Sequence, residues 1–101
     1  IALIEEGTPV IAIAPVDSSI SLMESSIREC KSRGGRIILI TDSDGHITET
    51  ADVVIPAQST HPILSPIINV IPLQLLAYNL GLAIGTNVDR PRNLAKSVTV
   101  V

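Results

Sequence analysis

Hydrophobic residues in the first third of the chain change from a continuous run to a helical spacing. Residues 8–16 are mostly Val, Ile and Ala, which is typical of a parallel strand buried on both faces. The apolar residues that follow recur at helical spacing and predict one face of an amphipathic helix: Ile20, Met23, Ile27 and Cys30. Asp17, Ser18 and Ser19 are N-cap candidates for this helix, and Gly34 with Gly35 would end it.

The middle of the chain predicts two more strands. Residues 36–41 form the second strand, and residues 42–45, which include two Asp and a Gly, form a turn. Residues 47–51 leave room for only a short turn of helix before a third strand at residues 53–55. Pro56 ends that strand, and a loop follows it.

A long apolar segment comes next. Ser65 is the predicted N-cap, Pro66 the first helical residue, and Gly85 the stop after Ile84. The length nearly suffices for a membrane span. Polar and helix-disrupting residues inside the segment favour a buried, proline-kinked helix instead: Asn69, Pro72, Gln74, Asn79 and Gly81.

The order of elements is therefore strand, helix, strand, short crossover, strand, helix. This order predicts an α/β fold in three layers, with a parallel sheet and right-handed connections. Three strands make a poor independent sheet, so the sheet is expected to belong to a larger one. The sequence has no internal repeat and no low-complexity linker.

Composition narrows the class of protein. A formal net charge of -3 argues against nucleic acid as the main ligand, because no basic stripe is present to neutralise phosphates. One cysteine, Cys30, excludes an intrachain disulfide framework and fits a reducing, cytoplasmic compartment. Residues 1–16 have no basic region typical of a signal peptide. The abrupt start at Ile1 indicates a fragment of a longer protein.

Several polar residues are weak candidates for chemistry. Asp17, Ser18 and Ser19 could face a sugar phosphate after the first strand, but capping explains them better. Asp42 and Asp44 resemble the acidic pair of receiver domains or a metal site, although a solvated loop is the simpler interpretation. His46 and His61 have no Cys or carboxylate at metal-ligand spacing, and Cys30 lies on an apolar helix face. We expect neither a metal nor a cofactor.

The last thirteen residues, 89–101, do not look like a fraying end. Pro91 fixes one φ angle and pushes Arg90 toward an extended conformation. A single lysine, Lys96, follows among small and apolar neighbours that could keep water away from its amine. Desolvation lowers the pKa of an amine, as a Schiff-base lysine requires. On chemistry alone, an exposed lysine on a terminal strand is the commoner case.

These residues carry a resemblance to a known family. The sequence Asn-Leu-Ala-Lys-Ser-Val-Thr-Val at residues 93–100 resembles the terminal signature of the glutamine:fructose-6-phosphate aminotransferase (isomerising) family. Residues 71–78, Ile-Pro-Leu-Gln-Leu-Leu-Ala-Tyr, are similar to the last-helix motif of that family, and residues 2–4 and 9–11 to an earlier part. The family usually ends in Glu where this chain has Val101.

The resemblance implies a fold, a reaction and roles for individual residues. Residues 1–86 would be the C-terminal portion of the second, flavodoxin-like sugar isomerase (SIS) domain, and residues 87–101 an active-site tail. The reaction converts fructose 6-phosphate and glutamine to glucosamine 6-phosphate and glutamate. Lys96 would be catalytic and would bind the opened sugar together with the backbone of Ala95, while Leu94 would help to close the ammonia path.

The resemblance also implies partners that this chain does not contain. These are the glutaminase domain and the first SIS domain of the same polypeptide, in a homodimer that binds no membrane and no nucleic acid. The general base, a histidine and a second lysine would precede Ile1, so we expect the chain alone to be inactive. The alternatives are a non-catalytic SIS module that senses sugar phosphates and, more distantly, a receiver-like domain phosphorylated at Asp42 or Asp44.

Overall fold

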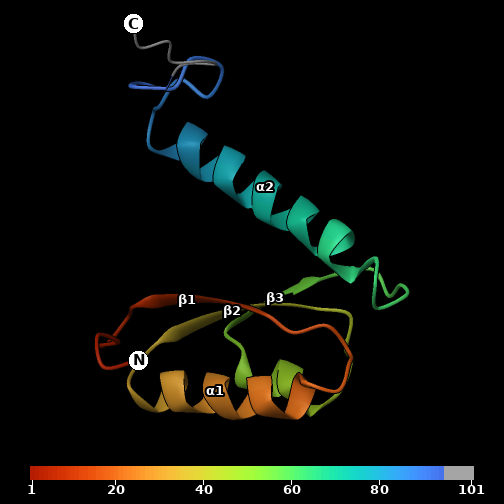
Figure 1. The fold of residues 1–101 in the computed structure, drawn as a ribbon. Helices are drawn as coiled ribbons and strands as arrows, with labels where there is room; N and C mark the ends of the chain where they lie inside the picture. Colours follow the sequence, from red (N-terminus) through yellow and green to blue (C-terminus); the bar gives the residue numbers. More distant parts are fainter. Residues whose placement is uncertain (95–101) are drawn as a thin grey trace, which may run out of the picture.

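A computed structural model describes residues 1–94 as a three-stranded parallel sheet with helices. The sheet order is β1-β2-β3 (Figure 1). The elements in chain order are β1 (Pro9–Ile13), α1 (Ile20–Ser32), β2 (Arg36–Thr41), the 3-10 helix η1 (His46–Thr50), β3 (Val53–Pro56) and α2 (Ser65–Ala83). The predicted order and the parallel sheet are therefore confirmed.

The strand β1 is shorter than the expected run of residues 8–16. The backbone N–H of Ala14 still donates to the Ile40 carbonyl at 2.9 Å. Pro15 has no N–H with which to continue the ladder. The N–H of Val16 donates instead to the Asp42 carboxylate at 2.8 Å, so the chain leaves the sheet here.

The core lies between the sheet and α1. Alternate residues of β1 and β2 pack against the apolar face of α1. The helix α1 lies along one face of the sheet, and η1 contacts α1 on the same side (Figure 1). The buried cluster is wholly aliphatic apart from one thiol: Ala12, Ala14, Ile27, Cys30, Ile37, Leu39 and Ile47. In the described structure, Cys30 is a packing residue of this layer.

The opposite face of the sheet is also apolar but only partly covered. The residues that point away from α1 come from all three strands, as the paired registers show: Ile11, Ile13, Ile38, Ile40, Val53 and Ile55. Ile11 is 46% exposed and Val53 41% exposed. The expectation that the first strand is buried on both faces is therefore wrong for the described chain, in which only α2 approaches this second face.

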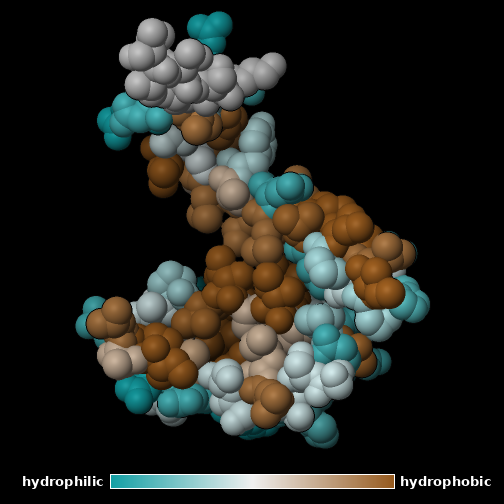
Figure 2. All heavy atoms as spheres, in the orientation of Figure 1, coloured by the Kyte–Doolittle hydropathy of each residue, from teal (hydrophilic) through white to brown (hydrophobic). Residues whose placement is uncertain are grey.

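The helix α2 begins beyond the end of β3 and slants away from the sheet (Figure 1). The expectation of a buried helix is wrong for the described chain, because Asn69 is its one buried residue. Large side chains remain exposed along its length: Ile67, Val70, Ile71, Leu75, Tyr78, Leu80 and Leu82. Figure 2 shows the brown, hydrophobic surface along this helix. The radius of gyration is 16.5 Å, whereas a compact domain of this length has about 13 Å.

The start of α2 also differs from the expectation. Leu64 is the N-cap, so Ser65 is the first helical residue and Pro66 the second. The Ser65 hydroxyl does not cap the helix but accepts a hydrogen bond from the Asn69 side chain at 2.8 Å. Among residues 1–94, α2 alone has the length and apolar composition to cross a membrane, a test that core helices of soluble proteins also pass.

Candidate functional site

The carboxyl edge of the sheet joins the loops that follow β1, β2 and β3. The Thr41 hydroxyl donates to the Ala14 carbonyl at 2.6 Å, and Asp42 holds the N–H of Val16. A polar cavity of about 20 Å³ lies here, lined by Pro15, Val16, Asp17, Asp42, Gln58, Thr60, Pro62, Ser65 and Asn69. This volume holds about one water molecule, so this cavity is too small for a sugar phosphate.

Asp17 lies at this edge and orders the turn before α1. Its Oδ1 accepts the backbone N–H of Ser19 at 2.7 Å and the Ser19 hydroxyl at 2.6 Å. Both hydrogen bonds lower the pKa of Asp17, because they favour the ionised carboxylate. The bond from the Ser19 hydroxyl contributes most, and the bond from the Ser19 backbone N–H contributes less. Ser19 is the N-cap, but no side chain makes a capping hydrogen bond to α1. The predicted capping is therefore wrong, and the Asp17 carboxylate instead closes the turn that precedes the helix.

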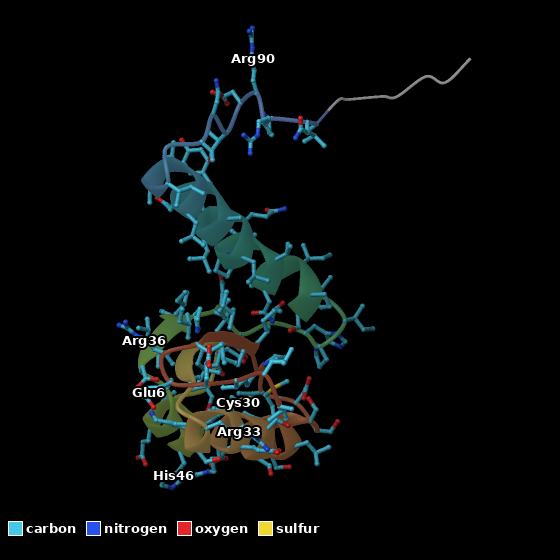
Figure 3. All side chains as sticks on the ribbon, turned by 90° about the vertical axis from the view of Figure 1, so that its left-hand side faces the viewer. Glu6, Cys30, Arg33, Arg36, His46 and Arg90 are labelled. Carbon is cyan, nitrogen blue, oxygen red and sulfur yellow. The ribbon has the colours of Figure 1, made fainter. Side chains whose placement is uncertain are left out.

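The other polar candidates do not come together. His46 lies on η1, 3.5 Å from the Glu49 carboxylate, and both side chains are well exposed. The Nδ1 of His61 accepts the N–H of Ile63 at 3.3 Å in a separate loop. Within residues 1–94, no three His, Cys, Asp or Glu side chains are placed to share a metal ion. Figure 3 shows His46 and Cys30 on the layer that α1 covers, far from Arg90 beyond α2.

The far end of α2 carries the second candidate region. Gly85 has φ +77°, its N–H donates to the Leu82 carbonyl at 3.0 Å, and the N–H of Thr86 donates to the Gly81 carbonyl at 2.9 Å. This pair of bonds is a Schellman motif, which ends the helix where the sequence predicts. Because Gly81 has no side chain, Val88 can lie directly over it.

A wide cavity of about 780 Å³ opens between the last turns of α2 and the segment that follows. Its lining residues are Ala77, Tyr78, Gly81, Thr86, Asn87, Val88, Arg90, Pro91 and Arg92. Two arginines and no carboxylate line it, so it favours an anionic or carbonyl-bearing group. Arg90 projects outward at this end of the molecule (Figure 3).

The predicted catalytic and substrate-binding residues, Lys96 and Ala95, lie outside the described residues. The structure describes the tail as far as Leu94, whose side chain is 72% exposed. The chain reaches that point through Asn93, which has φ +64°. The cavity at the end of α2 therefore borders the segment that leads to Lys96.

Sequence reasoning missed Asp52, which joins the sheet to α1. Its Oδ2 accepts the N–H of Ile37 at 2.7 Å, and Lys31 Nζ lies 3.4 Å from its Oδ1 and donates to the Thr50 carbonyl at 2.8 Å. The backbone bond from Ile37, with a smaller contribution from Lys31, lowers the pKa of Asp52. Asp52 and Ile37 are 15 residues apart in the sequence, so no local pattern identifies this contact.

Comparison with known proteins identifies relatives along the chain. The SIS domain family matches residues 1–84. The chain is 46% identical over 101 residues to glutamine--fructose-6-phosphate aminotransferase [isomerizing] from Xanthomonas campestris pv. campestris and 48% identical to that from Thermus thermophilus. Both alignments cover 99% of this chain and 17% of the relative, so the chain spans about a sixth of the length of these relatives.

A solved structure is also similar. It is the C-terminal domain of glucosamine-fructose-6-phosphate aminotransferase from Francisella tularensis, with a TM-score of 0.76 and 31% sequence identity. The match covers 88% of this chain and 26% of that one. Sequence and fold thus point to the same group of proteins.

Proposed function

The chain belongs to the SIS domain family, and from this premise we propose that it contributes to the isomerase half of a glutamine:fructose-6-phosphate aminotransferase. The resemblance found in the sequence and the α/β fold class are confirmed by the relatives and by the similar structure. The activity of the whole protein, its substrates and its partners are part of the proposal.

The proposed reaction is the conversion of fructose 6-phosphate and glutamine to glucosamine 6-phosphate and glutamate. Ammonia released from glutamine attacks C2 of the open-chain ketose, water leaves to give an imine, and a proton then moves from C1 to C2. Lys96 acts on the opened sugar, either as a transient Schiff-base partner or as an aid to ring opening. The backbone of Ala95 contacts the sugar, and Leu94 helps to exclude water from the ammonia path.

One observation carries this proposal: relatives that share 46–48% of the residues over 99% of the chain all bear the name of this enzyme. The described residues support it in two ways. The polar cavity beside Asp17 and Asp42 is too small for a sugar phosphate, and the wide cavity lies at the end of α2 that leads to the tail. We therefore assign the chemistry to the tail.

The described chain supplies no general base beside this cavity, since its lining has no carboxylate and no histidine. The proton shift between C1 and C2 needs a base within hydrogen-bond reach. We assign that base to the remainder of the polypeptide, together with the glutaminase domain and the first SIS domain. A cytoplasmic homodimer is the proposed assembly.

The test is Lys96→Arg in the full-length protein. Arginine keeps the charge but cannot form a Schiff base, so glucosamine 6-phosphate formation is expected to fall by about 100-fold or more while glutamate release from glutamine is kept. The matched control is Lys31→Arg, on α1 at the far side of the sheet, which should change neither activity (Figure 1). Unchanged amination in Lys96→Arg would contradict the role of Lys96, whereas a wild-type full-length protein that forms no glucosamine 6-phosphate would favour a non-catalytic sugar-phosphate module.

A further inference from the structure

The segment that joins α2 to the tail is held by its own hydrogen bonds. The Thr86 hydroxyl donates to the Gly81 carbonyl at 2.7 Å, in addition to the backbone bond from Thr86 to the same oxygen. Two donors on one carbonyl fix the direction in which the chain turns away from the helix axis. Thr86 itself is exposed, so this contact does not depend on burial.

The next residue adds a second restraint. The side-chain Oδ1 of Asn87 accepts the backbone N–H of Asp89 at 3.1 Å and that of Arg90 at 3.0 Å. An asparagine oxygen that binds backbone two and three residues ahead makes an Asx turn. Pro91 then fixes its own φ angle, and the N–H of Leu94 donates to the Pro91 carbonyl at 3.3 Å.

These bonds form a continuous series from the last turn of α2 to Leu94. The side chains of Thr86 and Asn87 make their hydrogen bonds entirely within residues 81–90 of the described chain. Neither side chain bonds to the sheet or to α1. A substitution at either position is therefore expected to change the path of residues 87–94 while the α/β layer stays intact.

We propose that Thr86 and Asn87 are positioning residues for Lys96, because their side chains set the direction in which the tail leaves α2. The inference rests on the proposed function of Lys96. A reacting group must be held within a fraction of an ångström of its productive position, and a displacement of about 1 Å can reduce a rate about 100-fold. The loss is expected in kcat for amination, because the proposal gives the side chains of Thr86 and Asn87 no contact with the sugar.

The experiment uses Thr86→Val and Asn87→Ala in the full-length protein. Each is expected to lower kcat for glucosamine 6-phosphate formation by about 10-fold or more, with KM for fructose 6-phosphate changed less than about 3-fold and glutamate release kept. Thr86→Ser retains the hydroxyl donor and Asn87→Asp retains the oxygen acceptor. Both conservative variants should therefore stay within about 2-fold of the wild-type kcat.

Matched controls lie elsewhere in the chain. The Asn79 side chain donates to the Leu75 carbonyl on α2 at 2.7 Å, and the Thr48 hydroxyl donates to the Gly45 carbonyl at 2.8 Å. Asn79→Ala and Thr48→Val each remove a hydrogen bond from a side chain to the backbone outside the connecting segment, so both should leave kcat unchanged.

The outcomes separate this inference from the proposed function. Wild-type kcat in both Thr86→Val and Asn87→Ala, in an enzyme that Lys96→Arg inactivates, would overturn the positioning roles alone. Equal losses in the conservative and non-conservative variants, or parallel loss of glutamate release, would also overturn them. Wild-type amination in Lys96→Arg would overturn the function of the tail itself.

Discussion

At the scale of single residues, side chains that bind backbone groups decide the local geometry. Asp52 pairs with Ile37 twice: its N–H donates to the Ile37 carbonyl at 2.9 Å, and its carboxylate accepts the Ile37 N–H at 2.7 Å. The side chain thus extends the ladder between β2 and β3 at the point where β3 begins. The carboxylate therefore adds one bond to the backbone ladder that sets the register of the third strand.

The lowered pKa of Asp52 predicts how acid affects stability. A carboxylate whose pKa is lower in the folded state stabilises that state above its unfolded pKa, near 3.8, and loses this contribution as the pH falls through the folded pKa. Asp52→Asn should therefore lower the urea concentration at which half of the protein is unfolded at pH 7. This concentration should also depend less on pH between about 5 and 3 than it does in the wild-type protein. The exposed residue Asp44 provides a control, Asp44→Asn. Identical pH dependence in wild type and Asp52→Asn would contradict this.

At the scale of elements, periodicity and end signals predicted most of the described structure. Gly34 and Gly85 both end helices with positive φ, and β2 spans residues 36–41 as expected. The errors came from contacts that periodicity does not contain. The sequence favours Ser65 as a cap, but Leu64 is the N-cap. The expected burial of α2 requires surfaces that residues 1–94 do not supply.

The layer between the sheet and α1 predicts the cost of a core substitution. Leu39 is 0% exposed in the middle of β2, so Leu39→Ala leaves a cavity and should cost about 2–5 kcal/mol of unfolding free energy. Leu22 lies on the outer side of α1 and is 72% exposed, so Leu22→Ala should cost below about 1 kcal/mol. Urea unfolding of the full-length protein measures both. Equal costs would contradict the assignment of this layer as the core.

At the scale of the whole molecule, two apolar surfaces face each other, and the described residues cover neither of them fully. One is the outer face of the sheet and the other is α2 (Figure 2). Aliphatic residues lie on all sides of α2, which is typical of a helix that other parts of a protein surround. The sequence predicted that the sheet belongs to a larger one, and the relatives, of which the chain spans 17%, are long enough to supply it.

These surfaces predict the behaviour of the isolated chain. Large exposed apolar patches associate in water. The 101-residue chain should therefore bind a hydrophobic dye such as ANS and self-associate at micromolar concentration. Adding two glutamates on the exposed face of α2, Ile67→Glu and Ile71→Glu, should reduce both effects. Light scattering and dye fluorescence are the measurements. A monodisperse monomer that binds no dye would contradict the account.

The functional site was less predictable than the fold. The role of Lys96 came from resemblance alone, because one lysine among small residues has no diagnostic spacing. The Asx turn at Asn87 has a local signal, because asparagine side chains commonly bind the backbone N–H two residues ahead of them. This signal does not enter the prediction of the site from the sequence. The wide cavity at the end of α2 depends on how the chain folds back over Gly81, which no periodicity encodes.

The role of the tail is tested by the ratio of glucosamine 6-phosphate formed to glutamate released by the full-length protein with Lys96→Arg. This ratio is expected to fall by about 100-fold while glutamate release continues, because ammonia is still produced but the opened sugar is no longer processed. A ratio equal to that of the wild-type protein would show that the tail does not carry the chemistry proposed for it.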